Sequence, residues 1–130
     1  GILRGVCETL HQERSAYDWV GFYLAEGEKQ ELVLGPYVGA RTEHTRIPFG
    51  KGICGQVALS KETLVVPDVA AEDNYLSCST DVKSEIVIPI VVGDRFVAQI
   101  DIDSHSLGRF GTSDRSLLQK LALALAPHFA

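Results

Sequence analysis

The chain has few of the features that mark secreted, membrane-spanning or nucleic-acid-binding proteins. Its three cysteines are an odd number, too few for a disulfide scaffold in 130 residues. No stretch approaches the ~18 consecutive apolar residues of a spanning helix, and no segment looks like a secretory signal. A net charge of −5 argues against a nucleic-acid or anionic-membrane surface. We therefore expect a cytoplasmic protein with mostly reduced thiols.

Methionine is also absent, so we expect Gly1 to be a processed start and part of the N-terminus to be missing. The apolar content of 45% is enough to bury a core. There is no repeat, linker or low-complexity tract. A single domain over residues 1–130 is therefore the predicted organisation.

Hydrophobic periodicity predicts an α+β fold. Apolar stripes with helical spacing open and close the chain, the second beginning near residue 112. A third, short helix is expected at 53–60, and a long polar loop at 67–83. Aromatic and β-branched runs predict strands at residues 19–24, 32–38, 45–49, 64–66, 85–92 and 95–103, the last two forming a hairpin.

Strand parity predicts a sheet with one apolar face, because side chains two apart point the same way. We expect the terminal helices to pack on that face. Its predicted members are Val20, Phe22, Leu24, Ile86, Ile88, Ile90, Phe96, Ala98, Ile100 and Ile102.

The opposite face collects polar and aromatic side chains. Those that could bind or react with a ligand are Trp19, Tyr23, Glu85, Asp101 and Asp103. Val97 and Gln99 lie on the same predicted face. Solvated strand ends are the ordinary alternative for each carboxylate. Three carboxylates beside two aromatic rings, beneath the long loop, nevertheless suit a pocket for a cationic ammonium group.

Two of the three thiols have positions that suit redox chemistry. Cys54 falls in the first turn of a predicted helix, where the dipole stabilises a thiolate, and Cys78 falls in the polar loop. A nucleophile, a resolving sulfur and acids for a departing oxygen are what a thiol redox enzyme needs. A buried or incidental thiol is the alternative for each, and Cys7, on an apolar stripe, fits packing alone.

A metal site is a further alternative. Asp101, Asp103 and His105 alternate along an extended segment, and Cys54, Cys78 or His44 are possible additional ligands. No CxxC or HxxxH pairing supports it, and the loop at Gly50 lacks the GxxxxGK[ST] spacing of a phosphate cradle. We therefore expect neither a metal nor another cofactor.

Several runs of sequence occur together in the order and spacing of one family. They are Asp18-Trp19-Val20-Gly21-Phe22-Tyr23-Leu24, Leu34-Gly35-Pro36, Arg46-Ile47-Pro48-Phe49-Gly50-Lys51-Gly52-Ile53-Cys54-Gly55, Ser84-Glu85-Ile86-Val87-Ile88-Pro89, Asp101-Ile102-Asp103-Ser104 and Gly108-Arg109-Phe110, with Cys78 seven residues before Glu85. Through them nearly the whole chain resembles a GAF domain, and within that superfamily the free methionine-(R)-sulfoxide reductases.

The resemblance implies a fold and a role for each matched residue. The fold is a central antiparallel sheet with the N- and C-terminal helices on one face and a ligand pocket under loops on the other. By position, Cys78 resembles the catalytic cysteine. The implied binding and proton-handling acids are Glu85, Asp101 and Asp103, and the implied pocket walls are Trp19 and Tyr23.

One position departs from the family pattern. Many members carry a third cysteine ten residues before the position of Cys54, and it resolves the oxidised catalytic cysteine. Here that position is His44. Either Cys54 or an external thiol therefore takes over resolution, and the sequence leaves both possibilities open.

The implied activity is reduction of free L-methionine-(R)-sulfoxide to methionine, through a sulfenic acid on Cys78 and a disulfide that thioredoxin reduces. Either Glu85 or Asp103 would donate the proton. The alternative is a sensory GAF domain that binds a small ligand without catalysis, since fold alone does not decide function. The thiol pair, and the absence of an output domain from 130 residues, favour the enzyme. The apolar stripes of the terminal helices predict a homodimer.

Overall fold

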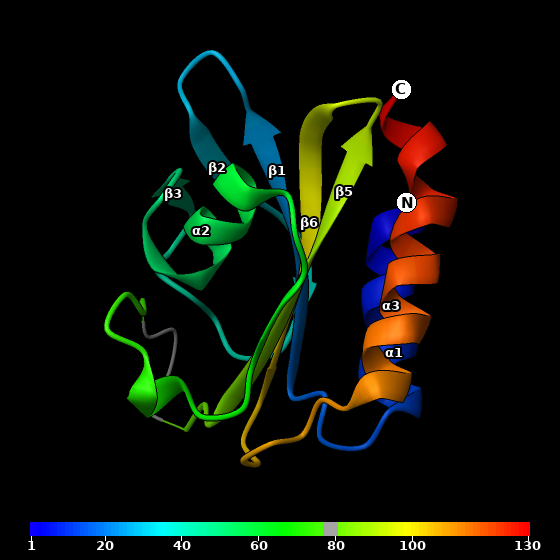
Figure 1. Ribbon diagram of the computed structural model, residues 1–130. Helices are drawn as coiled ribbons and strands as arrows, with labels where there is room; N and C mark the ends of the chain where they lie inside the picture. The colour runs from blue at the N-terminus through cyan, green and yellow to red at the C-terminus, as the bar shows by residue number, and fades with distance from the viewer. Residues whose placement is uncertain (77–80) are drawn as a thin grey trace.

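The computed structural model describes residues 1–76 and 81–130, and it confirms the α+β class (Figure 1). Within these residues one antiparallel sheet has the strand order β3-β2-β1-β6-β5-β4. The strands are β1 (Trp19–Glu26), β2 (Glu31–Val38), β3 (Arg46–Pro48), β4 (Leu64–Val66), β5 (Ser84–Val92) and β6 (Arg95–Ser104). The helices are α1 (Ile2–Glu13), α2 (Gly52–Ser60) and α3 (Thr112–Leu125), with 3-10 turns η1 (Val69–Ala71) and η2 (Ala126–Phe129).

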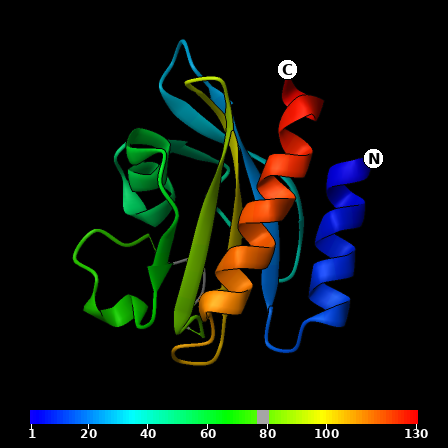
Figure 2. The same ribbon diagram turned by 45° about the vertical axis from the view of Figure 1, so that its right-hand side comes forward.

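The terminal helices α1 and α3 cover one face of the sheet, as predicted (Figures 1 and 2). Their apolar stripes meet the alternate apolar residues of β1, β5 and β6. Cys7 belongs to this core and is fully buried, which confirms its packing role. The centre of the cluster is formed by Val20, Phe22, Ile86, Ile88, Ile100, Ile102 and Leu118.

A β-bulge overturns the prediction for two residues of β6. The register with β5 shifts between Ile90 and Val91, whose partners are Ala98 and Phe96. The extra residue, Val97, reverses the alternation before Ala98. Phe96 therefore packs in the core on the α2 side, and Val97 packs against the core under α1 and α3. The sequence shows no turn residue there that would reveal the shift.

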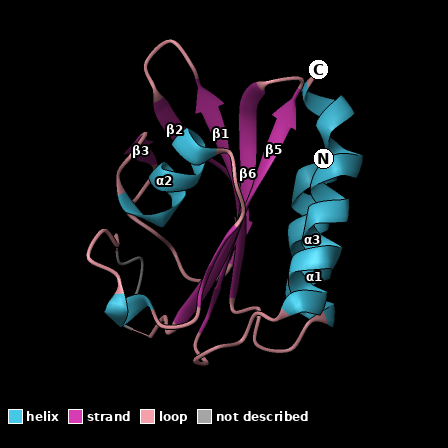
Figure 3. Cartoon of the chain, viewed as in Figure 1, coloured by secondary structure: helices cyan, strands magenta, loops and turns pink. Residues whose placement is uncertain are grey.

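Helix α2 and the segment after β4 lie on the opposite face of the sheet (Figure 3). The predicted long loop contains η1, where the Asp68 carboxylate accepts a hydrogen bond of 3.0 Å from the Ala70 N–H. Backbone hydrogen bonds fasten this segment, from Val69 N–H to Lys83 O at 2.9 Å and from Gly108 N–H to Pro67 O at 2.9 Å. It is therefore attached to the sheet end that carries the acidic side chains. Among the described residues, no helix combines the length and apolarity that crossing a membrane demands.

Candidate active site

The three acidic residues lie together on adjacent strands and are buried. Glu85 on β5 is directly opposite Asp103 on β6, and Asp101 is two residues before Asp103. Their exposed fractions are 4% for Glu85, 1% for Asp101 and 2% for Asp103. The alternative of solvated strand ends is therefore wrong, and all three point toward the α2 side as parity predicts.

Burial opposes ionisation of this cluster. It raises the pKa of Asp101, and hydrogen bonding to Glu85 and Cys54 opposes that rise only in part. Burial and the nearby charge of Asp101 raise the pKa of Asp103 well above its usual range. One oxygen of Asp101 and one of Asp103 have no hydrogen-bond partner among the described residues. Such atoms are costly unless something binds them, so the cluster is suited to a cation or a proton donor.

Cys54 lies above this cluster in the first turn of α2 and is also buried. Burial raises the pKa of its thiol well above the ordinary value, and the charges of Asp101 and Glu85 raise it further. The expectation that the helix dipole holds a thiolate here is therefore wrong. Three nearby carboxyl groups and loss of water outweigh the dipole.

Two polar residues that the sequence did not single out hold the beginning of α2. The Gln99 side chain, fully buried on β6, donates a hydrogen bond of 3.0 Å to the Cys54 carbonyl. Asn74 accepts one of 2.8 Å from the Gly52 N–H and donates one of 3.0 Å to the Gly50 carbonyl. Strand parity placed Gln99 on this face without giving it a role, whereas nothing in the sequence around Asn74 marks its role.

Trp19 and Tyr23 form an aromatic layer beside the acids. Trp19 is the cross-strand partner of Asp103. Its ring stacks on Tyr37, with centroids 5.3 Å apart, and its Nε1–H donates to the Ala40 carbonyl at 2.9 Å. The Tyr23 hydroxyl donates to the His44 carbonyl at 2.8 Å. Tyr23 is thus part of the pocket wall. Trp19 is not, and its ring stacks on that of Tyr23.

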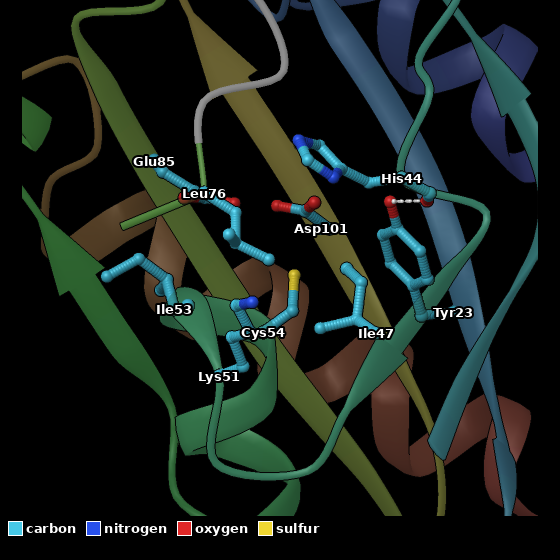
Figure 4. A pocket seen from close by; sticks show the side chains of 10 residues that line it. Tyr23, His44, Ile47, Lys51, Ile53, Cys54, Leu76, Glu85 and Asp101 are labelled. Carbon is cyan, nitrogen blue, oxygen red and sulfur yellow. Dashed lines mark hydrogen bonds between the residues drawn. The ribbon is translucent and has the colours of Figure 1, made fainter. Parts of the chain in front are cut away.

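These elements enclose a small cavity (Figure 4). The sulfur of Cys54 and the carboxylate of Asp101 point toward one another across it. Its volume is about 10 Å³, room for about one water molecule. Its walls are Tyr23, His44, Ile47, Lys51, Gly52, Ile53, Cys54, Leu76, Glu85 and Asp101. Asp103, the cross-strand partner of Glu85, is not part of this wall.

The same groups determine how a metal could bind. Cys54, Glu85 and Asp101 each offer a ligand atom, and the three atoms lie within 4.8 Å of one another. The described residues add no fourth ligand to this group. His105, weighed as a ligand from the sequence, lies beyond β6 and is exposed, with its Nδ1 3.8 Å from Asp18.

The position predicted for the nucleophile, Cys78, lies outside the described residues. Of the other predicted site residues, Cys54, Glu85, Asp101 and Tyr23 meet at the cavity. His44, in place of the family's third cysteine, lines the same cavity.

The chain is similar to known proteins in both sequence and fold. A family model described as a GAF domain matches residues 1–128. The free methionine-R-sulfoxide reductase of Saccharomyces cerevisiae is 41% identical over 107 residues, which are 81% of this chain and 59% of that protein. The chain thus spans less than two thirds of that relative. The enzyme of the same name from Escherichia coli is 36% identical over 123 residues, 95% of this chain and 73% of that protein.

Solved structures agree. The type II free methionine-R-sulfoxide reductase of Thermoplasma acidophilum has a TM-score of 0.93 at 33% identity, covering 98% of this chain and 92% of that one. The Neisseria meningitidis enzyme, solved in complex with its substrate, has a TM-score of 0.92 at 38% identity, covering 98% and 75%. These matches support the reductase interpretation over that of a sensory module. The chain belongs to the GAF domain family and, within it, to the free methionine-R-sulfoxide reductases.

Proposed function

We propose that this protein reduces the R epimer of free methionine sulfoxide, with Cys78 as the nucleophile. In the net step, the Cys78 thiol takes the sulfoxide oxygen and becomes a sulfenic acid, and methionine leaves. The sulfur of Cys78 is oxidised by two electrons and the sulfur of the substrate is reduced by two. The choice of Cys78 rests on its position seven residues before Glu85.

The observation that carries this proposal is the buried acid cluster with unpartnered oxygens on Asp101 and Asp103. A free amino acid brings an α-ammonium group, which compensates buried negative charge, whereas methionine within a polypeptide has no such group. The aromatic layer of Tyr23 and Trp19 adds a surface that attracts a cation. The cluster therefore suits free methionine sulfoxide better than an oxidised protein.

Protonation of the departing oxygen falls to Glu85 or Asp103. Glu85 lines the cavity, and Asp103 hydrogen-bonds to it from the adjacent strand. Burial and the charge of Asp101 raise the pKa of Asp103, which favours a protonated carboxyl in the pair. In this mechanism Glu85 touches the substrate, and Asp103 restores its proton.

Cys54 is the proposed resolving cysteine. Its thiol attacks the sulfenic sulfur of Cys78, a disulfide forms, and the sulfenic oxygen leaves as water. Asp101, hydrogen-bonded to Cys54, is placed to accept the thiol proton. A dithiol such as thioredoxin then reduces the disulfide and regenerates both thiols.

Separated epimers of the free amino acid test the activity. With dithiothreitol, the wild-type protein should reduce free L-methionine-(R)-sulfoxide, and neither the S epimer nor the N-acetylated R epimer. Cys78→Ser should abolish turnover, while Cys7→Ser, on the opposite face, should retain it. Turnover that survives in Cys78→Ser, or equal rates on the acetylated substrate, would contradict the proposal.

The predicted homodimer and cytoplasmic location remain proposals. A dimer is supported by an apolar groove between α1 and α3 and by exposed Ile2 and Leu123, which are 58% and 75% exposed. Light scattering at micromolar concentration should give twice the chain's mass of 14.1 kDa. A monomeric mass would refute it.

A further inference from the structure

The cavity beside Cys54 is closed to any molecule of amino-acid size. Its volume of about 10 Å³ is comparable to that of a single water. Leu76 forms part of the wall and presses on Gly52, where an added Cβ would lie 3.0 Å from the Leu76 Cγ. Cys54 beneath is only 6% exposed. Among the described residues, the Leu76–Gly52 contact is therefore part of the barrier between solvent and the thiol.

The side chain of Asn74 links the segment that carries Leu76 to the turn that carries Gly52. Asn74, two residues before Leu76, holds the Gly50–Gly52 turn with both ends of its amide. Its own backbone carbonyl accepts a third hydrogen bond, of 3.2 Å, from Gln56. The segment that carries Leu76 is thus attached to the beginning of α2.

Helix α2 needs Asn74 as a capping residue, because its own N-cap position provides no side-chain acceptor. Its N-cap, Lys51, makes no side-chain hydrogen bond, and the first N–H groups of a helix have no partner within the helix. The Asn74 oxygen takes the Gly52 N–H and so acts as a cap from a distant segment. Release of Asn74 therefore frees the helix end and the wall together.

We propose that Asn74 is a clasp, a positioning residue that closes the pocket over Cys54 and must release before a substrate enters. Closure follows from geometry alone. The statement that the incoming molecule is free methionine sulfoxide rests on the proposed function.

Alkylation of individual cysteines, followed by peptide mass spectrometry, tests the clasp without any assay of activity. Cys78→Ser protein serves as the background, so that Cys7 and Cys54 are its two remaining thiols. In it, Asn74→Ala should speed alkylation of Cys54 about tenfold, the factor expected for two lost hydrogen bonds of ordinary strength. Asn74→Asp keeps the acceptor for Gly52 and loses the donor to Gly50, so its effect should be smaller.

Two controls separate a clasp from general damage. Cys7 is buried on the other face, so its labelling rate reports global unfolding. Asp68→Ala removes a cap in the same segment, at Ala70, that does not touch Gly50 or Gly52. Neither Cys7 labelling in Asn74→Ala nor Cys54 labelling in Asp68→Ala should accelerate. An unchanged Cys54 rate in both Asn74 variants, or an equal rise at Cys7, overturns the clasp.

A kinetic comparison links the clasp to turnover. Because Asn74 must release before substrate enters, Asn74→Ala removes the cost of opening and should lower KM for free methionine sulfoxide several-fold, with Asp68→Ala unchanged. An unaltered KM in Asn74→Ala overturns this link. If the wild-type protein shows no reductase activity, the proposed function fails. The labelling experiment still tests whether Asn74 holds the pocket closed, because it does not depend on activity.

Discussion

A hydrogen bond from Gln99 holds the backbone of Cys54 in place over the acid cluster. The Gln99 amide, in the middle of β6, donates a hydrogen bond of 3.0 Å to the Cys54 carbonyl, and both residues are buried. Asp101 follows two residues later on the same strand face, so one strand positions both the carboxylate and the thiol. The Gln99 Oε1 has no hydrogen-bond partner in the described part of the chain.

Substitutions at Gln99 should separate charge from hydrogen bonding. Gln99→Leu loses one hydrogen bond and also removes an unpartnered oxygen, so the free energy of unfolding should change by less than about 1 kcal/mol. Gln99→Glu adds a fourth carboxyl to the buried cluster of Glu85, Asp101 and Asp103, and should cost about 2–4 kcal/mol at pH 8. Urea unfolding at pH 8 and pH 5 measures both. The cost of Glu should shrink at pH 5 as the carboxyl takes up a proton, and a cost for Leu as large as that for Glu would contradict this account.

The sequence predicted the acid cluster because strand parity needs only alternation. Glu85, Asp101 and Asp103 lie on uninterrupted stretches of β5 and β6. Alternation failed at Phe96 because a bulge inserts a residue without any Gly or Pro to reveal it. The thiolate prediction for Cys54 failed because burial and neighbouring charges come from segments distant in sequence. Asn74 was missed for the same reason, since its partners are more than twenty residues away.

The close approach of α2 to the Gly50 turn requires a glycine at position 55. A Cβ there would lie 2.8 Å from the Pro48 carbonyl oxygen and 2.9 Å from the Gly50 nitrogen, both backbone atoms. Gly55→Ala should therefore destabilise the protein by about 1–3 kcal/mol. Gly5→Ala, in α1 with no atom within 4 Å of the new Cβ, should instead stabilise by about 0.5–1 kcal/mol. Thermal unfolding of the pair is the measurement, and equal melting temperatures would contradict the clash.

Asp103→Asn should make the protein more stable and less active. The folded-state pKa of Asp103 is raised by burial and by the charge of Asp101, so the folded protein holds a proton that the unfolded chain releases above about pH 4. Stability therefore falls as pH rises from there through the raised pKa. A neutral amide removes this penalty, so the melting temperature of Asp103→Asn should exceed the wild-type value at pH 8 and match it more closely at pH 4.

Asp114 is a control for Asp103, because its pKa is lowered in the folded protein whereas that of Asp103 is raised. Burial opposes its ionisation, but hydrogen bonds from the Tyr17 hydroxyl at 2.6 Å and the Gly111 N–H at 2.9 Å, with the charge of Arg109, lower its pKa overall. Its contribution is present above pH 4 and is lost as pH falls through the lowered folded value. Asp114→Asn should thus destabilise at pH 8. A loss of stability in both variants at pH 8 would mean that the pKa of Asp103 is not raised.

Turnover should pass through a disulfide between Cys54 and Cys78. The buried Cys54 stays a thiol at rest, because burial and the charges of Asp101 and Glu85 raise its pKa. It therefore becomes useful only after Cys78 turns into an electrophilic sulfenic acid. The bond also requires the two Cα atoms to come within about 7 Å.

Trapping is the direct measurement of this step. After one equivalent of free methionine-R-sulfoxide and blocking of remaining thiols, peptide mapping should recover Cys54 linked to Cys78. Cys54→Ser should accumulate sulfenic acid at Cys78 and lose thioredoxin-driven turnover, yet still release one methionine per chain, because the chemical step does not need the second thiol. Cys7→Ser should behave as wild type. Normal turnover of Cys54→Ser with thioredoxin, and no linked peptide, would mean that an external thiol resolves the intermediate, with His44 standing where other members keep their third cysteine.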